Sequence, residues 1–220
     1  MVLTLYHFPP SGPSRGALLA AKAVGVDVDV QIINLFKKEQ LKEDFIKINP
    51  QHTVPTLVDG DVSIWDSHSI ATYLATAYGK DDSLYPKDPK QRALVDQRLF
   101  FDCGTLYPRI RAICFPVLFL GEDQIFDEHK TPLEEALGFL DVFLEGNDFV
   151  TGNKLTIADC SLAASVSTIA AVGWDLSPYS NVAAWIARCS LAIPGYAEAN
   201  QAGADEFGKL VRSKLAPGQL

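Results

Sequence analysis

The chain has 220 residues, of which 48% are hydrophobic and 21% charged, so it is long enough to bury a substantial core and too apolar to be disordered. Its formal net charge of −8 argues against a nucleic-acid partner, because phosphate binding needs a basic surface. No uninterrupted apolar run approaches the roughly 18 residues of a membrane span, and the strand-like start at Met1 and Val2 lacks a secretion-signal pattern. We therefore expect a cytoplasmic protein with no membrane partner.

Residues 1–79 are predicted to form a mixed α/β domain. Asp59-Gly60 is a hairpin signal between two short β-prone runs, and apolar residues at helical spacing follow Asp66 and Ser67. The expected elements, in order, are a strand at 3–6, a helix ending near Gly25, a strand at 28–34, a short helix at 39–47, strands at 56–58 and 62–64, and a helix from about residue 67.

Residues 80–89 have the composition of a linker, and residues 90–220 are predicted to be entirely helical. Pro108 and Pro116 should bend a long first helix, because each removes a backbone hydrogen bond. Asp159 follows Thr156 by three residues, which is a variant of the capping box and gives this carboxylate a folding role. The expected helices span 90–119, 131–144, 156–171, 182–190 and 196–200, of which the third is apolar enough to be central.

The four cysteines show neither a C-x-x-C motif nor a metal-ligand spacing, so we expect no metal site. Cys103 and Cys114 would lie about 16 Å apart along one helical face, beyond the roughly 7 Å that a disulfide can span. All four, including Cys160 and Cys189, are predicted to be free thiols buried in the core.

Two short motifs resemble the thioredoxin fold: Ser11-Gly12-Pro13-Ser14-Arg15, which opens a helix, and Thr53-Val54-Pro55-Thr56. In that fold the second motif carries a cis proline facing the start of the helix. Thioredoxins have cysteines where this chain has Ser11 and Ser14, and a hydroxyl cannot form a disulfide. Redox exchange is therefore excluded, and the resemblance implies that a ligand supplies the thiol.

Five motifs occur in order over nearly the whole chain: 11–15, 49–57, 65–70, 83–88 and 155–159. Together they resemble the cytosolic glutathione S-transferases, most closely the insect delta and epsilon classes, with a lean to epsilon. The resemblance implies an α/β plus all-α fold, with an N-terminal thioredoxin-like domain and a C-terminal helical bundle. It also implies a homodimer, with His68 near the interface, that uses glutathione as co-substrate and needs no metal. Conjugation to hydrophobic electrophiles, peroxide reduction and elimination of HCl all occur in the family.

Ser11 is the candidate catalytic residue, because its hydroxyl could hydrogen-bond to the glutathione sulfur at the positive end of a helix. A free thiol with a pKa of about 8.5 is mostly un-ionised at pH 7, so thiolate stabilisation is needed. The alternative is that Ser11 only caps the helix. Ser14 lies nearer the helix and is expected to be the plain cap.

The resemblance assigns the rest of glutathione to residues around the second motif. Val54, before Pro55, should pair its free backbone groups with the cysteinyl unit. Asp66 would bind the γ-glutamyl ammonium and Ser67 its carboxylate; alternatively both only cap a helix. His52 would contact the glycyl carboxylate, unless it is simply solvated. A second histidine of epsilon-class proteins is replaced by Gln40, which leaves Lys38 or Lys42 as unassigned alternatives.

The second substrate should bind against the bent long helix. Arg111 stands apart there, because a buried arginine is rare without a partner. The alternative for each of these residues is ordinary helix packing, and Tyr6 is expected to be a core residue instead. The candidate lining residues are Tyr107, Ile110, Arg111, Cys114, Leu118, Phe119 and Phe207.

Two rival functions remain open from the sequence. One is a non-catalytic, ligandin-type binding protein of the same fold, which would keep the apolar pocket without needing Ser11. The other is a scaffolding module. The presence of Ser11, Pro55, Asp66 and Ser67 together favours the enzyme.

Overall fold

The computed structural model describes residues 3–219, so the predicted strand start at Met1 and Val2 lies outside the described residues. The N-terminal domain contains a four-stranded sheet in the order β2-β1-β3-β4. Strand β1 (Leu3–His7) pairs parallel with β2 (Val28–Ile32) and antiparallel with β3 (Thr56–Asp59). Strand β4 (Val62–Trp65) completes the hairpin predicted at Asp59-Gly60.

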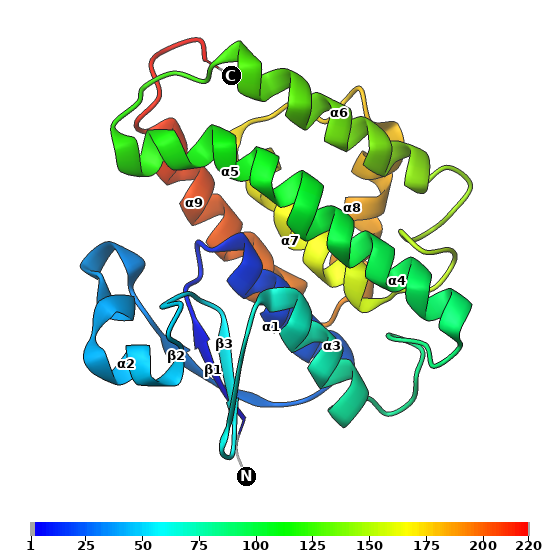
Figure 1. The fold of residues 1–220 in the computed structure, drawn as a ribbon. Coiled ribbons are helices and arrows are strands. Elements are labelled where there is room, and N and C mark those ends of the chain that lie inside the picture. The colour runs from blue at the N-terminus through cyan, green and yellow to red at the C-terminus, as the bar shows by residue number, and fades with distance from the viewer. Residues whose placement is uncertain (1–2, 220) are drawn as a thin grey trace.

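Helices α1 (Gly12–Val24) and α3 (Ser67–Tyr78) lie between this sheet and the helical domain (Figure 1). On the outer side, the helix predicted at 39–47 is shorter: two 3₁₀ turns, Leu35–Lys37 and Glu39–Leu41, precede α2 (Glu43–Ile48). The predicted helix is interrupted at Lys42, whose ψ of 142° is extended rather than helical. Tyr6 packs edge-on against Phe45 there, with ring centroids 5.5 Å apart, and is only half-buried.

The first helix of the C-terminal domain is one bent run from Pro89 to Leu120. Helix α4 (Pro89–Phe101) and helix α5 (Tyr107–Phe115) are joined by a π-helical turn, Asp102–Leu106, and a second π-helical turn, Pro116–Leu120, follows α5. Pro108 comes just after the first turn and Pro116 begins the second. The predicted bends therefore occur where prolines interrupt the backbone hydrogen-bond ladder.

By length and apolar composition this run could cross a membrane. A core helix of a globular protein passes the same test, and here α5 packs along α6 (Asp127–Phe143) and α7 (Ile157–Val172). The Arg109 guanidinium pairs with the Glu135 carboxylate at 3.1 Å and donates to the Pro132 carbonyl at 2.7 Å. These charged contacts hold the run within the helical domain.

Helix α7 is the buried centre of this domain, as predicted. Asp159 and Thr156 form the predicted capping box: an Asp159 carboxylate oxygen accepts from the Thr156 backbone N–H at 2.8 Å. The other carboxylate oxygen accepts from the Trp185 indole N–H at 2.9 Å, which ties α7 to α8 (Ser180–Ala192). The cap therefore also stabilises helix packing.

The C-terminal end differs from the prediction of a single helix at 196–200. A π-helical turn, Ala197–Gln201, leads into α9 (Ala202–Arg212). Gly203 and Gly208 make this segment a poor helix by propensity. They are tolerated because α9 packs so closely that a Cβ at Gly203 would lie 2.2 Å from the Pro9 carbonyl oxygen, and one at Gly208 2.0 Å from that of Ala171.

One cysteine prediction is wrong. Cys114, Cys160 and Cys189 are buried free thiols, but Cys103 is exposed. Cys103 lies within the first π-helical turn, whose extra residue rotates the side chains that follow by about 100° relative to a regular helix. The regular spacing assumed from the sequence therefore fails at this position.

Candidate functional site

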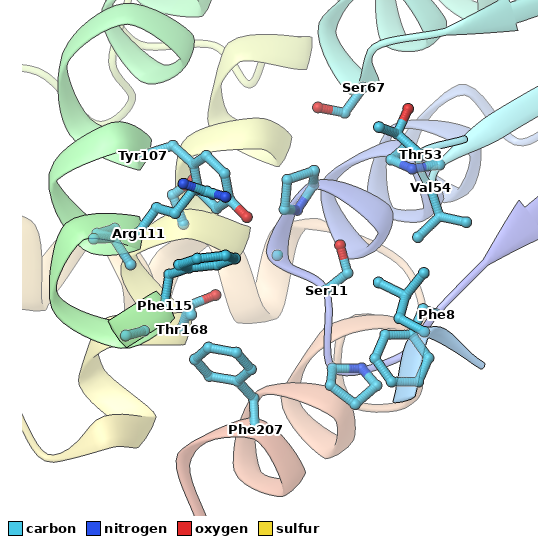
Figure 2. Close-up of a pocket in the computed structure, with 18 of the residues that line it drawn as sticks. Phe8, Ser11, Thr53, Val54, Ser67, Tyr107, Arg111, Phe115, Thr168 and Phe207 are labelled. Carbon is cyan, nitrogen blue, oxygen red and sulfur yellow. The ribbon is translucent and has the colours of Figure 1, made fainter. Parts of the chain in front are cut away.

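The two domains enclose a cleft of about 540 Å³ between α1, the loop before β3, and the long bent helix. Every residue that the sequence predicted for the site lines this cleft. They are Ser11, His52, Val54, Pro55, Asp66, Ser67, Tyr107, Ile110, Arg111, Cys114, Leu118, Phe119 and Phe207. Figure 2 shows Ser11 between the apolar wall of the long helix and the Thr53–Val54 turn.

Ser11 is the N-cap of α1: its side-chain oxygen accepts from the Ser14 backbone N–H at 3.4 Å. A hydroxyl that accepts through its oxygen can still donate its proton, so capping leaves Ser11 able to hydrogen-bond a ligand in the cleft. The expectation that Ser14 is the cap is wrong. Ser14 is buried, and its oxygen accepts from the Phe8 backbone N–H at 3.4 Å, which holds the loop before Ser11.

The Val54–Pro55 peptide bond is cis, and Val54 lies on the same side of the cleft as Ser11, facing the long helix (Figure 2). Among the described residues, no hydrogen bond engages the backbone N–H or C=O of Val54, so both are free for a ligand. Buried Asn49 shapes this turn by donating to the Thr53 carbonyl at 3.1 Å and the Thr56 hydroxyl at 2.9 Å. The Asn49 side chain makes four hydrogen bonds within this turn and therefore positions it. The sequence motif contains Asn49, but sequence reasoning did not assign it this role.

Asp66 caps α3 from a left-handed backbone conformation, with φ of 72°. Its carboxylate accepts from the backbone N–H groups of His68 at 2.9 Å and Ser69 at 3.0 Å. Burial alone would raise the pKa of Asp66, but these hydrogen bonds and the His68 side chain lower it overall. Beside it, the Ser67 hydroxyl points into the cleft (Figure 2). A carboxylate and a helix N-terminus thus stand side by side.

His68 connects this corner to the helical domain. Its Nε2 lies 3.0 Å from the Asp102 carboxylate, which also accepts from the Ser161 hydroxyl at 2.6 Å. Burial alone would lower the pKa of His68, but Asp102 and Asp66 outweigh it and raise the pKa to about 9. Asp102 lines the cleft and was missed by the sequence, because a π-helical turn brings it there.

Aromatic rings from both domains meet in the lining of the cleft. The Phe8 and Phe36 ring centroids are 5.4 Å apart, those of Phe36 and Phe119 6.1 Å, and those of Phe115 and Phe119 5.0 Å. Phe36 and Phe115 were not predicted from the sequence. The apolar pair Leu35-Phe36, between Asn34 and two lysines, was a signal that could have found Phe36.

Polar groups are few on the wall formed by the long helix. Burial raises the pKa of Tyr107 to about 12, so its hydroxyl is neutral. The Arg111 guanidinium carbon lies 3.9 Å from the centroid of the Phe115 ring. Arg111 is exposed and lines the cleft, which agrees with the prediction that it is more than a helix-packing residue; the fully buried arginine is Arg15.

Exposed His52 and half-buried Gln40 also line the cleft, whereas Lys38 and Lys42 do not. The Lys42 ammonium instead pairs with the Glu39 carboxylate at 3.6 Å. Within residues 3–219, no group of three or more His, Cys, Asp or Glu side chains is arranged to hold a metal ion.

Comparisons with known proteins agree with this geometry. Residues 1–76 match the family model of the glutathione S-transferase N-terminal domain, and residues 123–188 match that of the C-terminal domain. Glutathione S-transferase D7 of Anopheles gambiae is 46% identical over 217 residues, which cover 98% of this chain and 99% of that one.

Two solved structures extend the comparison. Glutathione S-transferase unclassified 2 from Bombyx mori is 53% identical with a TM-score of 0.94, covering 98% of this chain and all of the other. An epsilon-class glutathione S-transferase from the housefly Musca domestica is 44% identical with a TM-score of 0.92, covering 96% of this chain and 98% of that one. The chain therefore belongs to the glutathione S-transferase family, with insect delta- and epsilon-class enzymes among its relatives, and transfers the glutathionyl group to its substrates.

Proposed function

We propose that Ser11 activates glutathione by donating a hydrogen bond from its hydroxyl to the thiolate. The observation that carries this proposal is the position of Ser11: it caps α1 at the cleft, which Val54, with its free backbone groups, also lines. Lowering the thiol pKa by two units from about 8.5 requires about 2.7 kcal/mol of preferential thiolate binding. A charge-assisted hydrogen bond and a helix N-terminus together supply an energy of this order.

The remaining contacts to glutathione follow from the chemistry of its groups. The cysteinyl unit pairs with the Val54 backbone beside Pro55, as an added strand does at a sheet edge. Asp66, which stays ionised, binds the γ-glutamyl ammonium, while Ser67 and the N-terminus of α3 bind the adjacent carboxylate. His52 binds the glycyl carboxylate. We take residues 1–79 as the glutathione-binding domain and 80–89 as the linker.

The second substrate is a hydrophobic electrophile held by the helical domain, residues 90–220. Ile110, Cys114 and Leu118 form an apolar wall, with Phe119 and Phe207 at its edge. The thiolate sulfur forms a bond to an electrophilic carbon, and the leaving group departs with its electron pair. Peroxide reduction and elimination of HCl would start from the same thiolate. A homodimer in the cytosol, of delta or epsilon class, fits the relatives of both classes and the free thiols.

The test is the ultraviolet absorbance of the bound thiolate against pH for the wild type and Ser11→Ala. We expect a bound-thiol pKa about two units below 8.5, and a shift back of one to two units in the variant, with a tenfold to hundredfold lower kcat/KM at pH 6.5. Ser190→Ala is the matched control, because that exposed hydroxyl bonds only within α8. Tight glutathione binding without any thiolate shift in either protein would overturn the Ser11 mechanism.

A further inference from the structure

Arg15 is a buried ionisable group that has no role in the reaction proposed above. It lies one turn into α1, and its side chain crosses from the N-terminal domain into the helical domain with no exposed surface. The guanidinium donates to the Asn200 side-chain oxygen at 2.6 Å, to the Ser167 hydroxyl at 3.2 Å and to the Thr168 hydroxyl. All of these partners are neutral.

The charge of Arg15 therefore has no close counter-charge. Among the described residues, no Asp or Glu oxygen lies within 4.0 Å of its guanidinium. The titratable groups that face it are Tyr196, Tyr107, Asp205 and His7, of which only the Asp205 carboxylate carries a negative charge at neutral pH. Burial lowers the pKa of Arg15 to about 10, so the group remains protonated at neutral pH. A buried charge without a partner costs free energy of folding, so an anion bound nearby would be favoured.

The neighbourhood of Arg15 points to the cleft. The Arg15 backbone N–H donates to the Ser11 carbonyl at 3.0 Å, and Thr168, which accepts from the guanidinium, lines the cleft (Figure 2). The Thr168 hydroxyl lies 2.9 Å from the position that a Cβ on Gly12 would occupy. The unpaired charge thus sits directly behind the floor of the cleft where Ser11 and Gly12 begin α1.

We propose that Arg15 is a positioning residue of the transferase reaction, whose buried charge stabilises the thiolate of glutathione bound at Ser11. The bound anion supplies the negative charge that the protein interior omits, so binding the thiolate is favoured over binding the thiol. A carboxylate next to Arg15 would cancel this field. The proposal rests on the function proposed for Ser11.

Asn200→Asp tests this while leaving Arg15 in place. The new carboxylate has the same shape as the buried amide whose oxygen already accepts from Arg15, so it pairs with the guanidinium. We expect the pKa of bound glutathione to rise by about one unit, and kcat/KM to fall about tenfold at pH 6.5 and recover by pH 8.5. Asn153→Asp, which adds the same charge in an exposed loop, is the control.

Arg15→Lys is the second variant, and it keeps the buried charge that Asn200→Asp neutralises. Lysine keeps the charge but not the forked hydrogen bonds, so we expect a lower melting temperature with the bound-thiol pKa within about 0.3 units of the wild type. A purely structural role for Arg15 would leave the pH profile of Asn200→Asp unchanged, and that result would overturn the proposal. If Ser11→Ala leaves the pKa of the bound thiol unchanged while Asn200→Asp raises it, the Ser11 mechanism fails and the role of Arg15 is supported.

Discussion

A methyl group added at Gly203 should show how the loop that precedes Ser11 is held in place. Gly203 lies in α9, where alanine is favoured over glycine by about 0.8 kcal/mol on helix propensity. A Cβ there would lie 2.2 Å from the Pro9 carbonyl oxygen and 2.9 Å from Cδ of Arg15. Ordinary contact begins at 3.4 Å, so α9 or the loop has to move by roughly 1 Å.

Because the nearest atom belongs to the backbone, it cannot rotate away, and we expect overpacking near the upper end of its usual range. Gly203→Ala should lower the free energy of unfolding by about 2 kcal/mol net, and the melting temperature by about 5 °C. Pro9 precedes Ser11 by two residues, so the displaced loop should also raise KM for glutathione. Urea unfolding and glutathione-dependent kinetics measure the two effects.

Gly138→Ala is the matched control, because it makes the same substitution within α6, where a Cβ would meet nothing within 4 Å. This variant should gain about 0.5–1 kcal/mol from helix propensity alone and keep its kinetics. Equal stability changes in the two variants would refute the reasoning, because the predicted difference comes entirely from the space around the added methyl group.

Two further predictions concern buried charges. The pKa of His68 is raised from 6.5 to about 9, so the stabilisation from its charged form is complete below pH 6.5 and lost as the pH rises through 9. Urea unfolding at pH 6.5 and 9.5 should show the wild type losing about 3 kcal/mol more than His68→Gln; parallel losses would contradict this. Asp159→Asn should cost about 3 kcal/mol in urea unfolding, because an amide cannot accept from Trp185 and Thr156 as the carboxylate does. Asp175→Asn, at an exposed turn, should change the free energy by less than 1 kcal/mol, and equal losses in the two variants would sink the argument.

The sequence predicted the features that depend only on residues close to one another in the chain. The hairpin at Asp59-Gly60 and the capping box of Thr156 and Asp159 are local chemistry, and both are confirmed. The candidate site residues were found by motif, and the fold brings them to one cleft. Their individual roles stay predictions until the variants are measured.

The tertiary structure decided what depends on distant partners. Ser11 caps α1, whereas the Ser14 hydroxyl accepts from the Phe8 backbone N–H instead. Helix α9 can pack against the Pro9 and Ala171 carbonyls because Gly203 and Gly208 have no side chain. Arg15 is buried because Asn200 and its neighbours, far along the chain, meet its guanidinium. A residue type and its neighbours specify a local hydrogen bond, whereas burial and charge pairing are set only when the two domains pack.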